Sequence, residues 1–116
     1  MTAAELARLI SRGRYRFGHE TLLQDDVEAL LVVSGVSFRR EHIFGPADRV
    51  DFFVEGHIAL ELKVKGQRKA IFRQLERYSM HDCVDSLVLG TLAPMGLPAA
   101  IGGKPAYLVS LGRTGL

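Results

Sequence analysis

Cysteine is almost absent from this sequence, which has one among 116 residues and contains no tryptophan. A single cysteine cannot form an internal disulfide, which excludes a disulfide-stapled secreted mini-protein, and it cannot supply a thiolate zinc site alone. No apolar run approaches the roughly 18 residues that a membrane-spanning helix needs. The first residues also lack the basic and then apolar order of a signal peptide, so we expect a cytoplasmic protein without membrane contact.

The overall composition is close to that of an ordinary globular protein. Hydrophobic residues make up 47% of the chain and charged residues 24%, which is enough apolar material for a core and excludes disorder as the main state. The length predicts a single domain that spans residues 1–116. The formal net charge is only +2, so the clustering of the basic residues is more informative than their number.

Apolar periodicity and turn residues predict an alternation of helices and strands. We expect helices at 2–11, 19–34 and 67–80, and strands at 37–44, 49–54, 57–64, 86–91 and 106–111. The segment 93–104 is expected to be a loop, and the tail from Gly112 to be loose. Because the helix at 67–80 is followed by an apolar strand, we expect a crossover and an α/β fold with a mixed β-sheet flanked by helices.

Two acidic residues interrupt strands that are otherwise apolar. Asp51 lies between apolar neighbours, and Glu61 shares one strand face with Lys63 because side chains alternate along a strand. If the two strands form a hairpin, Asp51 and Glu61 lie near each other and repel unless a cation separates them. Their hard oxygen ligands suit Mg²⁺ or Mn²⁺. The alternative is ordinary alternation, with Glu61 and Lys63 facing solvent and Asp51 paired with a surface arginine.

A third acidic residue lies at the end of the apolar stripe of the helix at 19–34. Glu20 comes three residues before Leu23 and seven before Val27, which places it on the core-facing line of that helix. It can therefore point under the sheet toward the other two acids. The alternative is a helix-terminal charge, since an acid in the first turn is favoured by the helix dipole. Glu28, at the edge of the same stripe, is the second candidate for this role.

Together these residues resemble the PD-(D/E)XK nuclease superfamily, and in particular small stand-alone domains such as the VRR-NUC group and the archaeal Holliday-junction resolvases. The resemblance spans about residues 19–91 and rests on the acidic helix, on Asp51, on Glu61-Leu62-Lys63 and on a Q-x-x-x-Y pattern at Gln74–Tyr78. Val50 stands where the superfamily signature has proline. The resemblance implies a restriction-endonuclease-like core in the order α-β-β-β-α-β, with an extra N-terminal helix and a C-terminal strand.

The resemblance also implies a role for each acidic residue. Asp51 and Glu61 would ligate a divalent metal, Mg²⁺ or Mn²⁺, with help from the backbone carbonyl of Leu62. Glu20 would complete the site directly or through water. The metal would lower the pKa of a bound water and stabilise charge on the attacked phosphate. Lys63 would orient that water or neutralise the transition state.

Two residues of the following helix acquire roles by the same resemblance. Gln74 and Tyr78 would lie near the site and position metal-bound water, Lys63 or the phosphodiester. Without the resemblance, Gln74 reads as a helix-surface amide. Tyr78 then reads as a core aromatic residue beside Ile71 and Leu75.

Basic residues are concentrated around the helix at 67–80 and in the loop before the helix at 19–34. The candidate nucleic-acid-binding residues are Arg14, Arg16, Lys65, Arg68, Lys69, Arg73 and Arg77. The four-residue spacing from Lys65 to Arg77 predicts one helix face. Such groups contact phosphates, which gives salt-dependent binding with little sequence information. The alternative is a solvated helix face without a ligand.

The leading hypothesis is a divalent-metal-dependent DNA endonuclease that is structure-specific or weakly sequence-specific. The second is a non-catalytic nucleic-acid-binding module that keeps the nuclease fold, and the third is a small interaction protein with neither activity. The third leaves Asp51, Glu61 and Lys63 unexplained. If both strands of a duplex are cut, we expect a homodimer, because each chain would carry one site.

Overall fold

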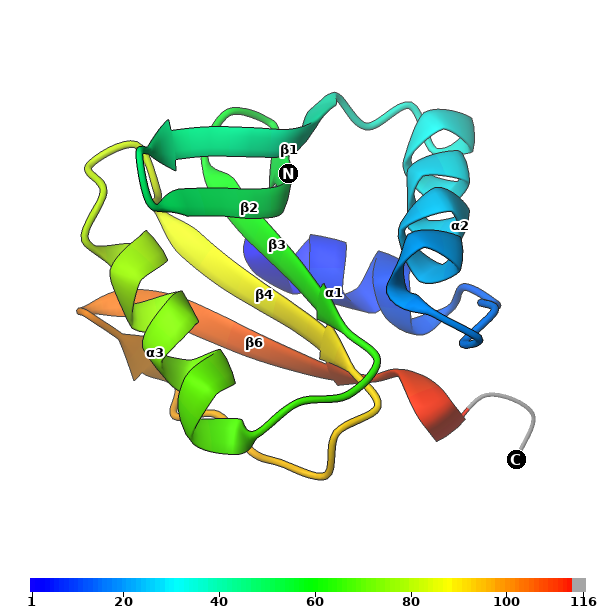
Figure 1. Cartoon of the computed structure of the whole chain (residues 1–116). Helices are drawn as coiled ribbons and strands as arrows, with labels where there is room; N and C mark the ends of the chain where they lie inside the picture. Colours follow the sequence, from blue (N-terminus) through cyan, green and yellow to red (C-terminus); the bar gives the residue numbers. More distant parts are fainter. Residues whose placement is uncertain (114–116) are drawn as a thin grey trace.

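The computed structural model describes residues 1–113 (Figure 1). Its helices are α1 (Ala3–Ser11), α2 (Glu20–Val33) and α3 (Arg68–Ser79), and a short 3-10 turn follows at Leu111–Arg113. Its strands are β1 (Phe38–Gly45), β2 (Asp48–Val54), β3 (Ile58–Lys63), β4 (Ser86–Thr91), β5 (Ala100–Ile101) and β6 (Lys104–Ser110). Residues 114–116, the end of the tail that the sequence predicts to be loose, lie outside the described residues.

The strands form one mixed sheet in the order β1-β2-β3-β4-β6-β5. The first three strands are antiparallel neighbours, whereas β3, β4 and β6 run parallel. Helix α3 connects β3 to the parallel β4, because a parallel pair needs a crossover. The predicted α/β class and the mixed sheet flanked by helices are therefore confirmed.

The C-terminal part of the sheet differs from the expectation in one respect. The segment predicted to be a loop contains the two-residue strand β5, which pairs with the start of β6 through Ala100↔Pro105 and Ile101↔Lys104. Gly102 and Gly103 form the turn between them, and both have positive φ angles. A prediction from apolar runs misses such a pair because two residues carry no periodicity.

Local sequence signals account for the ends of the main elements. Thr2 and Glu5 form the capping box of α1, since each side chain accepts a hydrogen bond from the backbone N–H of the other residue. Helix α2 ends where Gly35 takes a φ of 71°. The hairpin of β2 and β3 turns at Glu55 and Gly56, which both have positive φ, as a tight two-residue turn requires.

Helices cover both faces of the sheet, so its central strands are buried on both sides (Figure 1). Residues of α1 and α2 form one core with one sheet face, and residues of α3 form a second core with the opposite face. β3 lies between these cores and is buried from Ile58 to Leu62. Strands buried on both faces are normally apolar throughout, and Glu61 is the exception in β3.

We find no helix among residues 1–113 that combines the length and apolar character needed to cross a bilayer.

Candidate functional site

Strands β2 and β3 form backbone hydrogen bonds next to their turn. Where this pairing ends, two acidic side chains accept the backbone N–H groups instead. The ladder pair farthest from the turn is Phe52↔Leu60. Beyond it, the N–H of Asp51 donates to Oε1 of Glu61 at 3.1 Å, and the N–H of Leu62 donates to Oδ2 of Asp51 at 2.8 Å. Each carboxylate therefore serves as a ladder carbonyl would, and both acids are held where the two strands separate.

Glu61 is the more deeply buried of the two acids, with 2% of its surface exposed. Its Oε2 lies 3.5 Å from the ammonium nitrogen of Lys63, two residues along the same strand. Its Oε1 lies 3.2 Å from the hydroxyl oxygen of Tyr78 on α3. Both predicted neighbours of Glu61 are thus brought to it, one from β3 and one from the helix that covers this face.

The Tyr78 hydroxyl connects α3 to both acidic strands. Gln74 donates its amide N–H to this oxygen at 2.8 Å, and the hydroxyl lies 2.8 Å from the carbonyl oxygen of Arg49 in β2. A phenol has one proton, so it donates to Glu61 or to Arg49 at any moment. Burial and the charge of Glu61 raise the pKa of Tyr78, which keeps the hydroxyl protonated. Tyr78 is thus both a core aromatic residue and a neighbour of the acids.

Burial dominates the electrostatics of the acidic pair. It raises the pKa of Glu61 to about 8, and the charge of Asp51 acts in the same direction. It also raises the pKa of Asp51 to about 6, although the Leu62 N–H and the Lys63 charge favour the ionised form. The raised values show that one ammonium does not offset the cost of holding two negative charges in this gap.

Glu20 is the helix acid that faces this pair. As the first residue of α2, it accepts the backbone N–H of Val64 at 3.3 Å, just beyond β3, and its charge contributes to the raised pKa of Asp51. Glu28, the second candidate, instead accepts a hydrogen bond from Arg40 at 3.0 Å. Of the two helix acids, the structure therefore directs Glu20 toward the site.

The sequence analysis missed one direct neighbour of Asp51. The amide nitrogen of Gln24 lies 3.1 Å from Oδ1 of Asp51, and its amide oxygen accepts from Arg40 at 3.1 Å. The signal was its position one helical turn after Glu20, which places both side chains on the same helix face. Gln24 links the acid to α2 and to the guanidinium that rests over the Phe52 ring.

A second missed residue lies on the outer strand. Glu41 falls between the paired residues Arg40 and His42, opposite Asp51, and it has a φ of 53°. This left-handed conformation is uncommon for a residue other than glycine. It falls at a position that pairs with no described residue of β2, although β1 itself continues through it. Glu41 is exposed, but its charge raises the pKa of Asp51. A sequence pattern could not reveal it, because its place depends on the register of β1 with β2.

The donor chemistry of this site fits a hard divalent cation. Glu61 is buried and Asp51 half-buried, and their carboxylates lie close together, each accepting a backbone N–H from the opposite strand. Carboxylate oxygens are the ligands that such a cation prefers. Within residues 1–113, however, histidine, cysteine and acidic side chains do not gather in threes as a ready-made metal cluster. The fit therefore rests on the two strand acids, with Glu20 beside them and bonded to the Val64 N–H.

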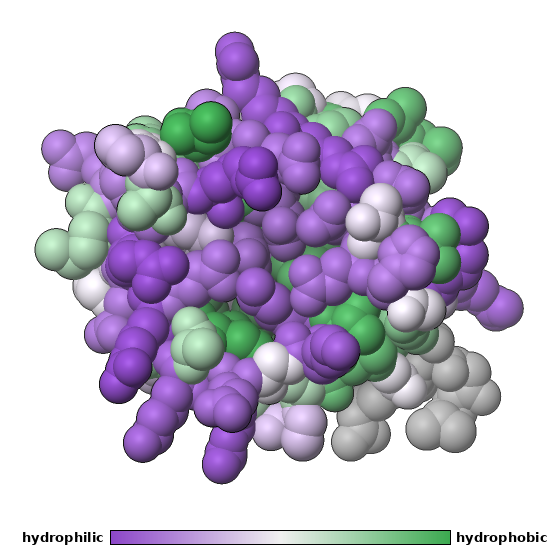
Figure 2. All heavy atoms as spheres, viewed as in Figure 1, coloured by the Kyte–Doolittle hydropathy of each residue, from purple (hydrophilic) through white to green (hydrophobic). Residues whose placement is uncertain are grey.

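The predicted basic residues do not all lie on one helix face. Lys65 precedes the start of α3 and lies in the loop after β3, which corrects its place in the predicted stripe. Lys69, Arg73 and Arg77 occupy the exposed side of α3, with Arg68 beside them at its first turn. Long hydrophilic side chains project at the lower left of Figure 2, where Figure 1 shows this helix.

Two of the predicted basic residues are engaged by acidic side chains. Arg16 pairs with Asp26 at 2.8 Å, and Arg77 with Asp48 at 3.0 Å. Arg14 is exposed in the loop before α2. In the described part of the chain, no acidic side chain pairs with Arg68, Lys69 or Arg73. Arg14 and Lys65 are likewise exposed and have no acidic partner among the described residues, so these five cations remain available to a phosphate backbone.

Comparison with known proteins gives no relative for this chain. No family model matches it, and neither a curated protein nor a solved structure is significantly similar to it.

Proposed function

We propose that this protein is a divalent-metal-dependent DNA endonuclease with a restriction-endonuclease-like core. The observation that carries the proposal is the pair of half-buried Asp51 and buried Glu61, held together where the pairing of two strands ends, with Lys63 beside Glu61. Two carboxyl groups in such a place can both ionise when a divalent cation binds them, whereas without one the pKa of Glu61 is raised to about 8. Glu20 adds a third negative charge, which acts on Asp51 from the start of α2.

Each residue of the site would have a separate role in metal binding or in catalysis. Asp51, Glu61 and the carbonyl of Leu62 would hold Mg²⁺ or Mn²⁺, and Glu20 would complete the site directly or through water. The bound ion would supply Lewis-acid stabilisation of the phosphate and lower the pKa of a water molecule. Lys63 would place its ammonium at the developing negative charge on the phosphate or orient the attacking water.

Gln74 and Tyr78 act through Glu61 in this proposal. The hydrogen bonds from Gln74 to Tyr78 and between Tyr78 and Glu61 orient one carboxylate oxygen, so that Oε2 is directed toward Lys63. Gln24 orients Asp51 in the same way from the opposite side of the sheet. These residues position the acids and do not need to touch the phosphodiester.

The surface supports DNA as the substrate and weak sequence selectivity. Arg68, Lys69 and Arg73 are exposed cations on one helix, and such groups contact phosphates, which carry little sequence information. This favours structure-specific cleavage over sequence readout. Cutting both strands of a duplex would take two copies of the chain, which light scattering on the purified protein with and without DNA would detect.

A second candidate function is a non-catalytic nucleic-acid-binding module. One observation favours it: each carboxylate already has a structural role, because it satisfies a backbone N–H of the opposite strand. Such a protein would bind DNA in a salt-dependent manner without metal and would cleave nothing.

The test is cleavage of single-stranded, duplex, flapped and four-way-junction DNA with Mg²⁺, with Mn²⁺ and with a chelator. We expect metal-dependent cleavage, and a loss of about two orders of magnitude or more in rate for Asp51→Asn. Asp82→Asn, at an exposed position of the α3–β4 loop, is the matched control and should cleave as wild type does. Equal cleavage by Asp51→Asn would reject the site, and DNA binding without any cleavage would select the second candidate.

A further inference from the structure

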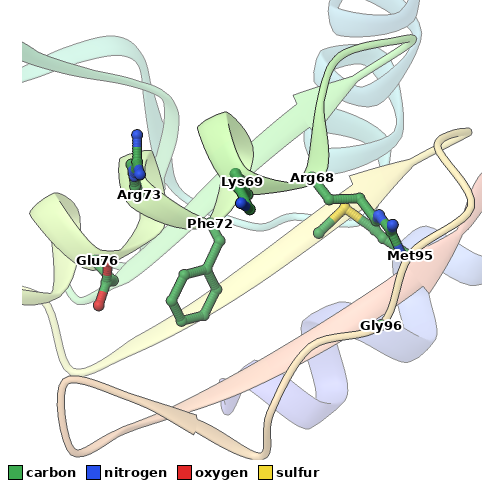
Figure 3. Close-up of a pocket in the computed structure, with 7 residues that line it drawn as sticks. All are labelled: Arg68, Lys69, Phe72, Arg73, Glu76, Met95 and Gly96. Atoms are coloured by element: carbon green, nitrogen blue, oxygen red, sulfur yellow. The ribbon is translucent and has the colours of Figure 1, made fainter.

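A groove runs between α3 and the segment 93–96 that follows β4. Two adjoining hollows make it up, of about 510 and 500 Å³, and they share Arg68 and Lys69 (Figure 3). Phe72 and Met95 lie along one hollow, and Gly66 with Gln67 lies at the end of the other.

One end of the groove lies on the loop that joins β3 to α3, a few residues along the chain from the acidic site. Gly66 and Gln67 belong to the same short loop as Val64, whose backbone N–H bonds Glu20. Lys63 is the residue just before that loop, and its ammonium contacts Glu61. A chain lying in the groove would therefore leave it at the loop that joins the acids to α3.

The lining of the groove is apolar at its base and positively charged at its rim. Phe72 and Met95 are half-buried and pack against the α3-side core, and in Figure 3 the Phe72 ring extends from the helix into the space that the groove occupies. Arg68, Lys69 and Arg73 line the same hollow. Glu76 is the acidic residue of this lining, at the far end from the loop. The charge balance favours a polyanion with planar apolar parts.

We infer that this groove binds a single strand of DNA and leads it to the acidic site. A base stacks on the Phe72 ring, since every base offers a flat face to an aromatic side chain, and the three cations contact phosphates. The inference rests on the proposed nuclease function and names its substrate class: DNA with a single-stranded segment next to the bond that is cut. An acidic peptide also matches the charge, but the Phe72 ring in the lining and the loop that the groove shares with the end of β3 favour DNA.

Binding can be measured separately from cleavage. The full-length chain is titrated into a fluorescent thymidine oligonucleotide in the presence of a chelator, and the anisotropy is recorded at several salt concentrations. We expect binding that weakens with salt, and about a tenfold loss of affinity for Phe72→Leu, which keeps an apolar side chain but removes the ring. Phe72→Tyr, which keeps an aromatic ring, should bind the oligonucleotide with the affinity of wild type. Arg73→Gln should weaken binding and lower the salt slope by about 0.7.

Arg8→Gln is the matched control, because Arg8 is an exposed arginine on α1, which packs with the opposite sheet face. It should bind as wild type does. The inference is overturned if Phe72→Leu and Arg73→Gln bind the oligonucleotide as wild type does, or if a polyglutamate peptide competes with it at equal concentration. Binding that follows these expectations in a chain that cleaves no DNA supports the groove and rejects the nuclease. Cleavage of DNA by a chain that does not bind the single strand supports the nuclease function and rejects the groove as a binding site.

Discussion

Lys63 holds its ammonium nitrogen 3.5 Å from Oε2 of Glu61, while Oε1 of the same carboxylate accepts the N–H of Asp51 at 3.1 Å. The buried acid is thus contacted by a positive charge on one side and by a neutral donor on the other. These contacts stabilise its ionised form, yet burial and the Asp51 charge outweigh them and raise its pKa to about 8. The balance at this carboxylate leads to the first two predictions.

The first prediction concerns the pH dependence of stability without metal. Folding raises the pKa of Glu61 from its ordinary 4.5 to about 8, so between these values the folded chain binds protons that the unfolded chain has released. The free energy of unfolding should therefore be highest below pH 4.5 as far as this group is concerned, and fall as the pH rises toward 8. Denaturant titrations at successive pH values with a chelator present measure this trend.

Glu61→Gln is the matched variant for that experiment, because the amide keeps the shape and cannot ionise. Its unfolding free energy should change less with pH between 5 and 8 than that of wild type, by an amount on the order of a few kcal/mol. Parallel pH profiles of the two proteins would contradict the assignment of the slope to Glu61.

The second prediction concerns the protons released when a divalent cation binds. At pH 7 the carboxyl of Glu61 holds its proton in the metal-free chain, because its pKa is about 8. A cation that binds this oxygen must displace the proton, so Mn²⁺ binding at pH 7 should release close to one proton per ion. Calorimetric titrations in two buffers of different ionisation enthalpy count it. An apparent enthalpy that is the same in both buffers would show that Glu61 is not a ligand.

The third prediction isolates the hydroxyl of Tyr78. Tyr78→Phe keeps the buried ring but removes the group that accepts from Gln74 and lies 2.8 Å from the Arg49 carbonyl. Because buried partners lose their hydrogen bonds, the unfolding free energy should fall by about 1–3 kcal/mol. Tyr107→Phe is the control, at a ring that is 38% exposed, and should change stability by less than about 0.5 kcal/mol. Equal effects in denaturant unfolding would show that the Tyr78 hydroxyl contributes nothing.

The fourth prediction compares two adjacent glycines in the turn between β5 and β6. Both have positive φ angles, so alanine strains the backbone by about 1–2 kcal/mol at either position. A Cβ on Gly102 would also collide with the side chain of Ser79 at the end of α3, whereas a Cβ on Gly103 meets open space among the described residues. Thermal unfolding should thus show Gly102→Ala to be less stable than Gly103→Ala by about 1–3 kcal/mol. If Gly103→Ala were the less stable variant, Gly102 would not pack against Ser79 as described.

Much of the sheet could be predicted from local signals. The turn at Glu55-Gly56 and the apolar strands on both sides of it were sufficient to predict that Asp51 and Glu61 are neighbours. The crossover through α3 followed from a helical period between two strands. These features are encoded within about a dozen residues of one another, where pattern and turn chemistry act directly.

The parts that could not be predicted depend on contacts between distant segments. Gln24 reaches Asp51 across 27 positions of the sequence, and Glu41 comes to lie opposite Asp51 through the register of β1. Lys65 was assigned to the helix face because its spacing from Lys69 continued the repeat, but α3 begins only at Arg68. Register and helix ends are set by tertiary packing, which a single sequence does not state.

The two hydrogen bonds between the acids and the backbone of β2 and β3 also bear on how the sequence could change in evolution. Each acid accepts a hydrogen bond from a backbone N–H of the facing strand. Replacing either acid by an aliphatic residue would therefore leave that N–H without an acceptor in the interior. Under the proposed function, a related chain that lost catalysis would therefore still be expected to retain both acids for stability. The Lys63 side chain bonds no backbone group among the described residues, so under the proposed nuclease function the loss of Lys63, rather than of the acids, would mark a relative that binds DNA without cleaving it.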